Sequence, residues 1–245
     1  YRDVGVGRIK HARFIGSWSA AVVETGDLRL GGLALDADGR AQLSYYNAAA
    51  GDLKFSSWTS SGWSTSTVFA AGDAGRLSAV ALDAAQNPSI LFTDDTAQQV
   101  RLYSYSGGWS SVLNSASAAS SSPALALGPS GDFAFAYGGF PGGGLEVATG
   151  TASGVTSSSR DGSVGSVGGL ALDGAGRPVV AYHDAGARDL KYARYTGVAW
   201  TTGTIDAAGD VGSNASLAVD GAGSVFVAYY DSTNGDLKLA EWTGG

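Results

Sequence analysis

Cysteine and methionine are absent from this 245-residue sequence, and histidine occurs only twice. Without cysteine there is no disulfide framework, no thiolate metal site and no cysteine nucleophile. Two histidines are too few for a zinc centre built from several of them. The chain also lacks a Gly-x-Ser-x-Gly nucleophile elbow and any run near the roughly 20 apolar residues of a membrane helix. These absences leave few routes to catalysis, and we expect no membrane insertion.

Charged residues are also scarce, at 15% of the chain, and 22 acidic residues outnumber 15 basic ones. Binding to phosphate backbones needs a concentrated basic face, so we expect no nucleic-acid partner. Hydrophobic residues make up 44% of the chain, which is enough to build a core. Many Gly and Ser residues with few charges are typical of extracellular β-proteins, so we expect a secreted or cell-surface protein. The sequence begins at Tyr1 without a signal-like segment, and we expect it to be a processed or excised piece.

A short motif recurs along the chain with a constant spacing. Its copies lie about 46 residues apart, a period typical of propeller repeats. No stretch shows the 3.6-residue periodicity of a helix. The copies are Leu33–Asp36, Val80–Asp83, Leu125–Gly128, Leu170–Asp173 and Leu217–Asp220.

Each repeat predicts four antiparallel strands. In the first repeat, residues 33–35 form a short inner strand that ends at an Asp-x-x-Gly turn. Residues 42–46 form the second strand, 53–58 the third and 63–68 a polar, alternating fourth strand typical of an exposed edge. The sequence therefore predicts an all-β fold, a β-propeller of four-stranded antiparallel blades.

The number of repeats favours a single five-bladed domain over residues 1–245. The repeats lie near 28–74, 75–119, 120–164, 165–211 and 212–245, and residues 1–27 are expected to close the ring, with Trp18 to Glu24 as the missing fourth strand. Third strands, however, number six, so either Gly7 to Phe14 or Gly235 to Trp242 would be displaced. A six-bladed propeller and an excerpt of a larger one stay open as alternatives.

Counting from the last residue of the inner-strand motif separates constant positions from varying ones. The ninth residue is always aromatic, as at Tyr45, which indicates core packing. The eleventh is usually Asp or Asn, which indicates either turn capping or ligand binding. The tenth differs between copies, as expected of a binding position or of an unconstrained exposed one. The predicted ligand-binding residues are Tyr46, Asn47, Thr93, Asp94, His183, Asp184, Tyr230 and Asp231.

Catalytic and metal-binding alternatives have weaker support. His183 next to Asp184 is the one acid/base pair beside a loop. Gly-Asp dipeptides before the inner strands, such as Gly72-Asp73, leave calcium as a possibility, although the EF-hand spacing is absent. We therefore predict no catalytic residue and no other cofactor. The acids that do not recur between copies, the candidates for a glycosidase pair, are Glu24, Asp95, Asp132, Glu146, Asp161 and Glu241.

Aromatic residues end the third strands, as at Tyr105 and Tyr195. Their recurrence favours a structural role, but rings that line a groove between blades could also stack on sugars.

The segment Ala228 to Lys238, with Asp-x-x-Gly before it and Trp-x-Gly after it, resembles the tandem repeats of bacterial secreted β-propellers. More loosely, the chain resembles propeller lectins of the five-bladed tachylectin type and fucose-binding seven-bladed proteins. The resemblance implies a non-catalytic protein that binds a glycan or another cell-surface ligand through several sites on one face. A propeller glycoside hydrolase and a structural or adhesive module stay open as alternatives, and so does an oligomeric state.

Overall fold

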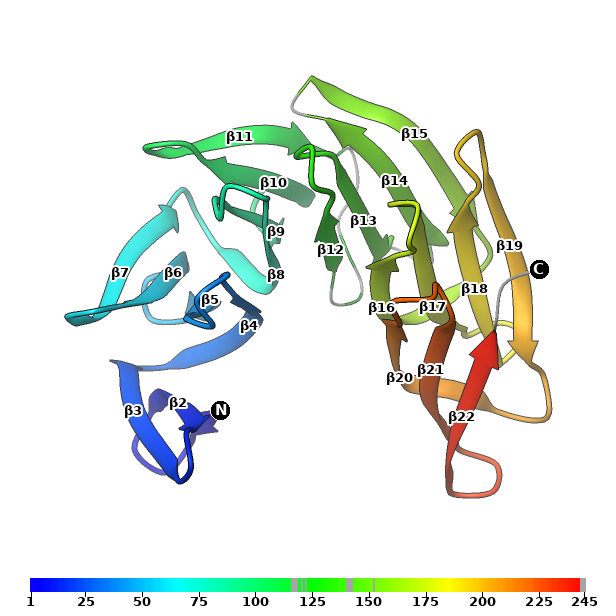
Figure 1. Cartoon of the computed structure of the whole chain (residues 1–245), viewed down its shortest axis with the longest axis horizontal. Coiled ribbons are helices and arrows are strands. Elements are labelled where there is room, and N and C mark those ends of the chain that lie inside the picture. Colours follow the sequence, from blue (N-terminus) through cyan, green and yellow to red (C-terminus); the bar gives the residue numbers. More distant parts are fainter. Residues whose placement is uncertain (116–118, 120, 122, 140–142, 152, 243–245) are drawn as a thin grey trace. The chain divides into compact units, whose positions relative to one another are not determined.

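The computed structural model describes residues 1–115, 119, 121, 123–139, 143–151 and 153–242. Within these ranges the chain folds into 22 β-strands that form six antiparallel sheets. No helix in the described part of the chain could span a membrane. The chain divides into two compact units, Tyr1–Ala116 and Ser117–Gly245, each with three sheets (Figure 1). That residues 1–245 form one domain stays a prediction.

The first unit contains the blue to green strands of Figure 1. The first sheet comprises β1 (Arg2–Asp3), β2 (Arg8–Phe14) and β3 (Trp18–Thr25). The second comprises β4 (Leu28–Leu35), β5 (Ala41–Asn47), β6 (Asp52–Thr59) and β7 (Gly62–Phe69), and the third β8 (Ala74–Leu82), β9 (Pro88–Asp94), β10 (Gln99–Tyr105) and β11 (Trp109–Asn114).

The second unit contains the remaining three sheets. The fourth sheet comprises β12 (Ala124–Leu127), β13 (Phe133–Gly138), β14 (Leu145–Thr151) and β15 (Gly154–Asp161), and the fifth β16 (Val164–Leu172), β17 (Pro178–Asp184), β18 (Asp189–Tyr195) and β19 (Trp200–Asp206). The sixth comprises β20 (Val211–Val219), β21 (Val225–Asp231) and β22 (Asp236–Trp242).

The count of six sheets shows that the prediction of five blades is wrong. The surplus third strand is not displaced, because β2 pairs with β1 on one side and with β3 on the other. The segment expected to complete the last sheet therefore belongs to the first sheet, while β22 pairs with β21. Short hairpin loops hold β1, β2 and β3 together, and closing a short loop costs less chain entropy than recruiting a strand from the other end of the chain.

The inner strands are longer than predicted. Strand β4 covers Leu28–Leu35 instead of three residues, and its register with β5 shifts between Leu30 and Leu33. At this bulge, a Cβ atom on Gly32 would lie 2.6 Å from the Val80 amide nitrogen of the third sheet. A bulge interrupts the alternation of side chains that identifies a strand in a sequence. The sequence pattern therefore predicted only the part of β4 that follows the bulge.

The turn and core predictions are confirmed. Asp36 accepts hydrogen bonds at Oδ1 from the Asp38 and Arg40 amides at 3.0 and 2.8 Å, and Gly39 completes the turn at φ 71°. Between neighbouring sheets lie buried apolar clusters, for example Ile9, Leu28 and Leu43 around the ring of Tyr45. The ninth-position aromatics are all buried, as expected of core residues: Tyr45, Phe92, Tyr137, Tyr182 and Tyr229.

Candidate functional site

Each four-stranded sheet has two ends that carry different loops. At one end, the second strand turns into the third; we call it the 2–3 end. At the opposite end lie the turns from inner to second strand and from third to fourth strand; we call it the 1–2 end. The predicted binding residues all belong to the 2–3 end, because they occupy the last positions of the second strands.

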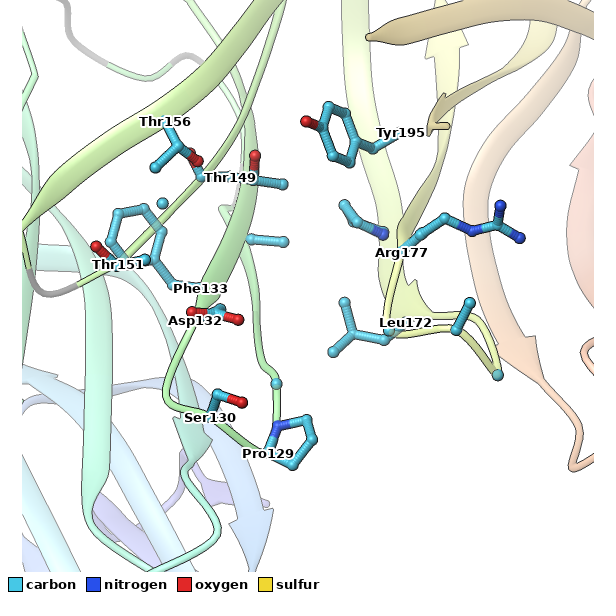
Figure 2. Close-up of a pocket in the computed structure, with 17 residues that line it drawn as sticks. Pro129, Ser130, Asp132, Phe133, Thr149, Thr151, Thr156, Leu172, Arg177 and Tyr195 are labelled. Carbon is cyan, nitrogen blue, oxygen red and sulfur yellow. The ribbon is translucent and has the colours of Figure 1, made fainter. Parts of the chain in front are cut away.

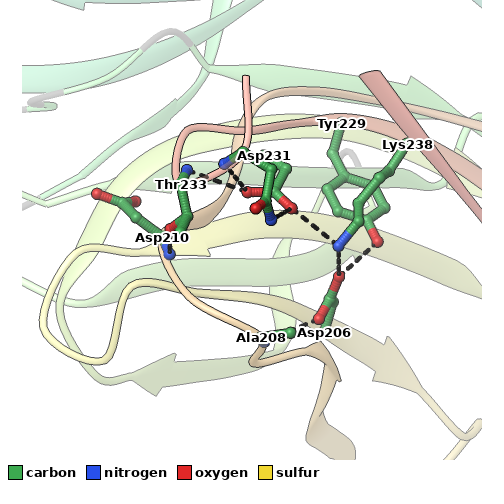
Figure 3. A network of polar contacts seen from close by, with 8 residues as sticks. Asp206, Ala208, Asp210, Tyr229, Asp231, Thr233 and Lys238 are labelled. Carbon is green, nitrogen blue, oxygen red and sulfur yellow. Dashed lines mark hydrogen bonds and ion pairs between the residues drawn. The ribbon is translucent and has the colours of Figure 1, made fainter. Parts of the chain in front are cut away.

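The eleventh-position acids stabilise the turn at the 2–3 end. Asp231 is fully buried and accepts hydrogen bonds from the amides of Thr233 and Asn234 and from the Asn234 side chain at 2.9–3.0 Å (Figure 3). The Lys238 ammonium lies 2.9 Å away. These donors, Asn234 first and then Lys238, lower the pKa of Asp231 to about 2.

The same arrangement recurs in other sheets. Asp94 caps Ala97 and pairs with Arg101 at 2.7 Å, and Asp184 caps its turn and pairs with Lys191 at 3.0 Å. The neutral Asn47 caps its turn through the amides of residues 49 and 50. The turn-capping interpretation of the eleventh position is therefore confirmed.

Three of the ninth-position tyrosines bind acids of the preceding sheet. The Tyr229 hydroxyl donates to Asp206 at the end of β19, with 2.7 Å between the oxygens. Burial and this carboxylate raise the pKa of Tyr229 to about 12. Where the third sheet has Phe92 instead of tyrosine, its ring meets Phe69 at 5.5 Å. The other tyrosine–acid pairs are Tyr45 with Glu24 and Tyr182 with Asp161.

This pairing changes the interpretation of the acids that do not recur in the register. Glu24 and Asp161 occupy equivalent positions at the ends of fourth strands, and each accepts a hydrogen bond from a tyrosine of the following sheet. Asp95 is held 2.9 Å from Arg76. His183 lies 3.4 Å from Asp210, whereas its sequence neighbour Asp184 is engaged by Lys191. Glu24, Asp161 and Asp95 thus have structural partners, whereas His183 Nε2 makes no hydrogen bond within the described residues. These contacts give the hydrolase hypothesis no support.

Several varying tenth residues reach the next sheet. Tyr46 on β5 donates its hydroxyl to Asp73, just before β8, with 2.6 Å between the oxygens. The Asp carboxylates of the Gly-Asp dipeptides, which were candidates for calcium binding, thus lie next to side chains of the preceding sheet. The described residues contain no group of three potential metal ligands. The equivalent contacts are Arg2 to Asp27 at 3.0 Å and His183 to Asp210 at 3.4 Å.

The remaining two tenth-position candidates differ in exposure. Thr93 is 2% exposed, and its hydroxyl accepts a hydrogen bond from the Leu77 amide at 3.3 Å. Tyr230 is 40% exposed, and its hydroxyl has no polar partner within the described ranges. The ligand-binding role of the eight predicted residues stays a prediction.

The 1–2 end holds a cavity of about 610 Å³ between the fourth and fifth sheets, within the second unit. One wall carries Phe133 with the hydroxyl groups of Thr149, Thr151 and Thr156 (Figure 2). The half-buried Tyr195 ring projects from the other wall, at the end of β18. The cavity thus combines an aromatic ring with several hydroxyl groups.

Two charged residues line the cavity: the exposed Asp132 on the wall of Phe133, and Arg177 on the other wall. The Arg177 guanidinium points away from the opposite wall, and its Nε donates to Asp173 at 2.9 Å. Burial opposes ionisation of Asp173, but backbone amides and Arg177 outweigh it and lower the pKa of this carboxyl. The Thr149 hydroxyl is buried at the cavity wall without a hydrogen-bond partner among the residues that the structure describes. A neutral ligand with hydrogen-bonding groups fits this lining.

The sequence partly anticipated this cavity. Tyr195 belongs to the aromatic series for which a groove between blades was considered, and the structure places it at such a groove. Thr149 was missed. A varying series could have revealed it, because the residue four places after the first aliphatic of each third strand also differs between copies. The series is Arg13, Ser57, Ser104, Thr149, Arg194 and Glu241.

No protein-family model matches the sequence, and no curated protein matches it significantly. Solved structures do match the fold. A six-bladed fungal lectin from Aleuria aurantia, described with a fucose recognition mode, has TM-score 0.62 and 16% identity over 98% of this chain and 85% of the lectin. A protein of unknown function from Dyadobacter fermentans has TM-score 0.60 and 12% identity, covering 92% and 79% of the two chains. Hydrazine synthase from Kuenenia stuttgartiensis has TM-score 0.56 and 11% identity, covering 86% and 67%.

These similarities show the β-propeller fold. The six blades of the lectin agree with the six sheets found here, and they differ from the seven blades expected of fucose-binding propellers.

Proposed function

We propose that this chain is a non-catalytic binding protein for neutral glycans and that it binds them in the cavity between the fourth and fifth sheets. The observation that supports this most directly is the buried Thr149 hydroxyl without a partner, in a cavity that the Tyr195 ring also lines. A buried hydroxyl without a hydrogen bond costs free energy, and a ligand hydroxyl would remove that cost.

The lining matches the surface of a sugar. A pyranose has an apolar face that stacks on an aromatic ring, which Tyr195 supplies. Its hydroxyl groups accept and donate hydrogen bonds, which Thr149, Thr151 and Thr156 can complete. A volume of about 610 Å³ lies within the range of small-ligand pockets.

The similarity to a fucose-recognising lectin supports a glycan as ligand, although it rests on fold alone. A secreted or cell-surface location, with a cell-surface glycan as partner, is part of this proposal. The 2–3 end is the second place where ligand contact is proposed, through the exposed Tyr230.

A glycan array probed with the chain tests the proposal, followed by titration of the strongest binder against two variants. Tyr195→Ala removes the stacking surface and should weaken binding by about 1.5 kcal/mol, near tenfold. Thr149→Val keeps the shape but removes the hydroxyl and should cost about 1 kcal/mol, roughly fivefold.

Tyr230→Ala distinguishes the two ends. If it abolishes binding while Tyr195→Ala does not, the site lies at the 2–3 end. If no glycan binds above background, the glycan proposal is wrong. Stable self-association without glycan binding would favour the structural or adhesive alternative.

A further inference from the structure

One turn of the first unit has a residue that the other copies avoid. Residue 86 occupies the position at which the other copies have glycine, and it adopts the same left-handed backbone, with φ 67°. A residue with a side chain is strained in this conformation, and such strain is often retained at functional sites. The equivalent glycines are Gly39, Gly131, Gly176 and Gly223, with φ between 71° and 87°.

The Gln86 side chain connects two neighbouring sheets. Its Oε1 accepts a hydrogen bond from the Ala37 amide at 2.7 Å, in the equivalent turn of the second sheet. Its Nε2 lies 3.4 Å from the Asp83 carbonyl oxygen of its own turn. A glycine could make neither contact, so the Gln86 side chain connects the turns at Asp36 and Asp83 in a way that the glycine of the other copies cannot.

These turns border a cavity of about 360 Å³ between the second and third sheets, at the 1–2 end of the first unit. Phe55 and Trp109 meet edge to face in its wall, with ring centroids 5.3 Å apart, and Tyr105 contacts Trp109 at 5.4 Å. The Trp109 indole nitrogen lies 3.4 Å from the Ser66 hydroxyl. None of the lining residues is charged.

Gln42 is the chemically distinctive residue of this cavity. It lines the cavity and is only 8% exposed, yet its side-chain amide makes no hydrogen bond within the described part of the chain. The amide is not among the fully buried groups without a partner, so it stays accessible and a ligand with hydrogen-bonding groups can reach it. The equivalent positions of the other second strands carry no amide: they are Ser89, Ala134, Val179 and Phe226.

We propose that the cavity between the second and third sheets is a second glycan site, which binds a pair of adjacent hydroxyl groups through the Gln42 amide, with Gln86 as a positioning residue for its wall. The amide presents one acceptor and two donors, so two neighbouring hydroxyls can satisfy it at two points. Tyr105 and Trp109 provide the aromatic surface for the apolar face of the sugar. This inference rests on the proposed glycan-binding function but concerns a different cavity. There, a side-chain amide would bind the sugar hydroxyls, in place of the threonine hydroxyls of the first cavity.

Trp109 offers a local reporter, because no tryptophan lines the cavity between the fourth and fifth sheets. The full chain is labelled with 5-fluorotryptophan and observed by ¹⁹F NMR, and the Trp109 signal is assigned as the one missing from Trp109→Phe. The labelled chain is then titrated with methyl α-L-fucoside, methyl α-D-mannoside and methyl β-D-galactoside. We expect at least one sugar to shift the Trp109 signal saturably. Thr149→Val should leave that titration unchanged.

Two variants test the assigned roles. Gln42→Leu should weaken the Trp109-detected binding at least tenfold, while the melting temperature without ligand stays nearly equal, because the amide makes no hydrogen bond in the free protein that the substitution would remove. Gln86→Gly restores the residue of the other copies, so it should fold normally and bind several-fold more weakly. Gln99→Leu, at the 2–3 end of the third sheet, is the matched control and should change neither binding nor melting temperature.

The outcomes separate the two proposals. If the Trp109 signal responds to no sugar while Tyr195-dependent binding persists, the second site is wrong and the proposed function stands. If neither cavity binds any glycan, both proposals are wrong. Unchanged affinity in Gln42→Leu would overturn the amide contact, and unchanged affinity in Gln86→Gly would overturn its positioning role.

Discussion

The hydrogen bond between Tyr229 and Asp206 provides a quantitative test of how neighbouring sheets are held together. The Tyr229 ring is 5% exposed, and its hydroxyl donates to Asp206 over 2.7 Å. Tyr229→Phe removes only the hydroxyl. Asp206 then keeps the Lys238 ammonium at 3.1 Å and the Ala208 amide at 2.9 Å, so the carboxylate stays partnered (Figure 3).

The expected loss of stability depends on the partners that Asp206 keeps. A hydrogen bond to a charged group contributes about 1.5–3 kcal/mol, and the lower part of this range applies because Asp206 is not left unpaired. We expect Tyr229→Phe to lower the free energy of unfolding by about 1.5–2 kcal/mol, or the melting temperature by roughly 3–8 °C. Tyr230→Phe is the matched control: its hydroxyl has no polar partner in the described ranges, so it should change stability by less than about 0.5 kcal/mol.

The pH dependence has a definite sign. The Ala208 amide, followed by the Tyr229 hydroxyl, holds the pKa of Asp206 below its usual value. A lowered pKa in the folded state stabilises the protein above the unfolded pKa of about 3.9, and this stabilisation is lost as the pH falls further. The difference between wild type and Tyr229→Phe should therefore be full at neutral pH and shrink below about pH 4.

Urea unfolding followed by circular dichroism at several pH values measures these differences. A double-mutant cycle with Asp206→Asn should give a coupling free energy of about 1 kcal/mol at neutral pH. A cost below about 0.5 kcal/mol at pH 7, or a cost that stays constant down to pH 3, would refute the reasoning.

Two further predictions concern stability. Lys238→Met removes the cation beside Asp231, so the pKa of Asp231 should rise. The midpoint of acid unfolding, followed by circular dichroism, should then move to higher pH, and an unchanged midpoint would contradict the assigned pairing. Gly212→Ala places a Cβ 2.9 Å from Leu190 Cα at φ +99° and should destabilise by more than about 2 kcal/mol in thermal unfolding, whereas Gly174→Ala, with open space around its Cβ, should be tolerated.

Several features of the fold follow from local sequence, because neighbouring residues alone cause them. The Asp-x-x-Gly turn at Asp36 forms through contacts within five residues, and the buried aromatic at Tyr45 follows from its place in a repeated strand. The capping of a turn by Asp231 is equally local. The repeat therefore predicted four-stranded units and their inward-facing residues.

The number of sheets was predicted wrongly, because it depends on which partner a strand selects. The repeat shows that residues 7–14 are a third strand, but it does not show whether they pair with β1 and β3 or leave the ring. Pairing with β1 and β3 requires only two short loops, and closing these costs less chain entropy than a pairing between the two ends of the chain.

What the sequence by itself determined is the repeated unit: its strands and turns, which arise from interactions over a few residues, and its aromatic positions, whose recurrence indicated the core. Only the tertiary structure decided which side chains meet between sheets. Tyr229 donates a hydrogen bond to Asp206, and Gln86 accepts one from the Ala37 amide. Thr149 keeps an unpaired hydroxyl at a cavity. These contacts join positions in different repeats, so packing of the sheets, and not the order of residues within a repeat, determines the cavities in which we propose that glycans bind.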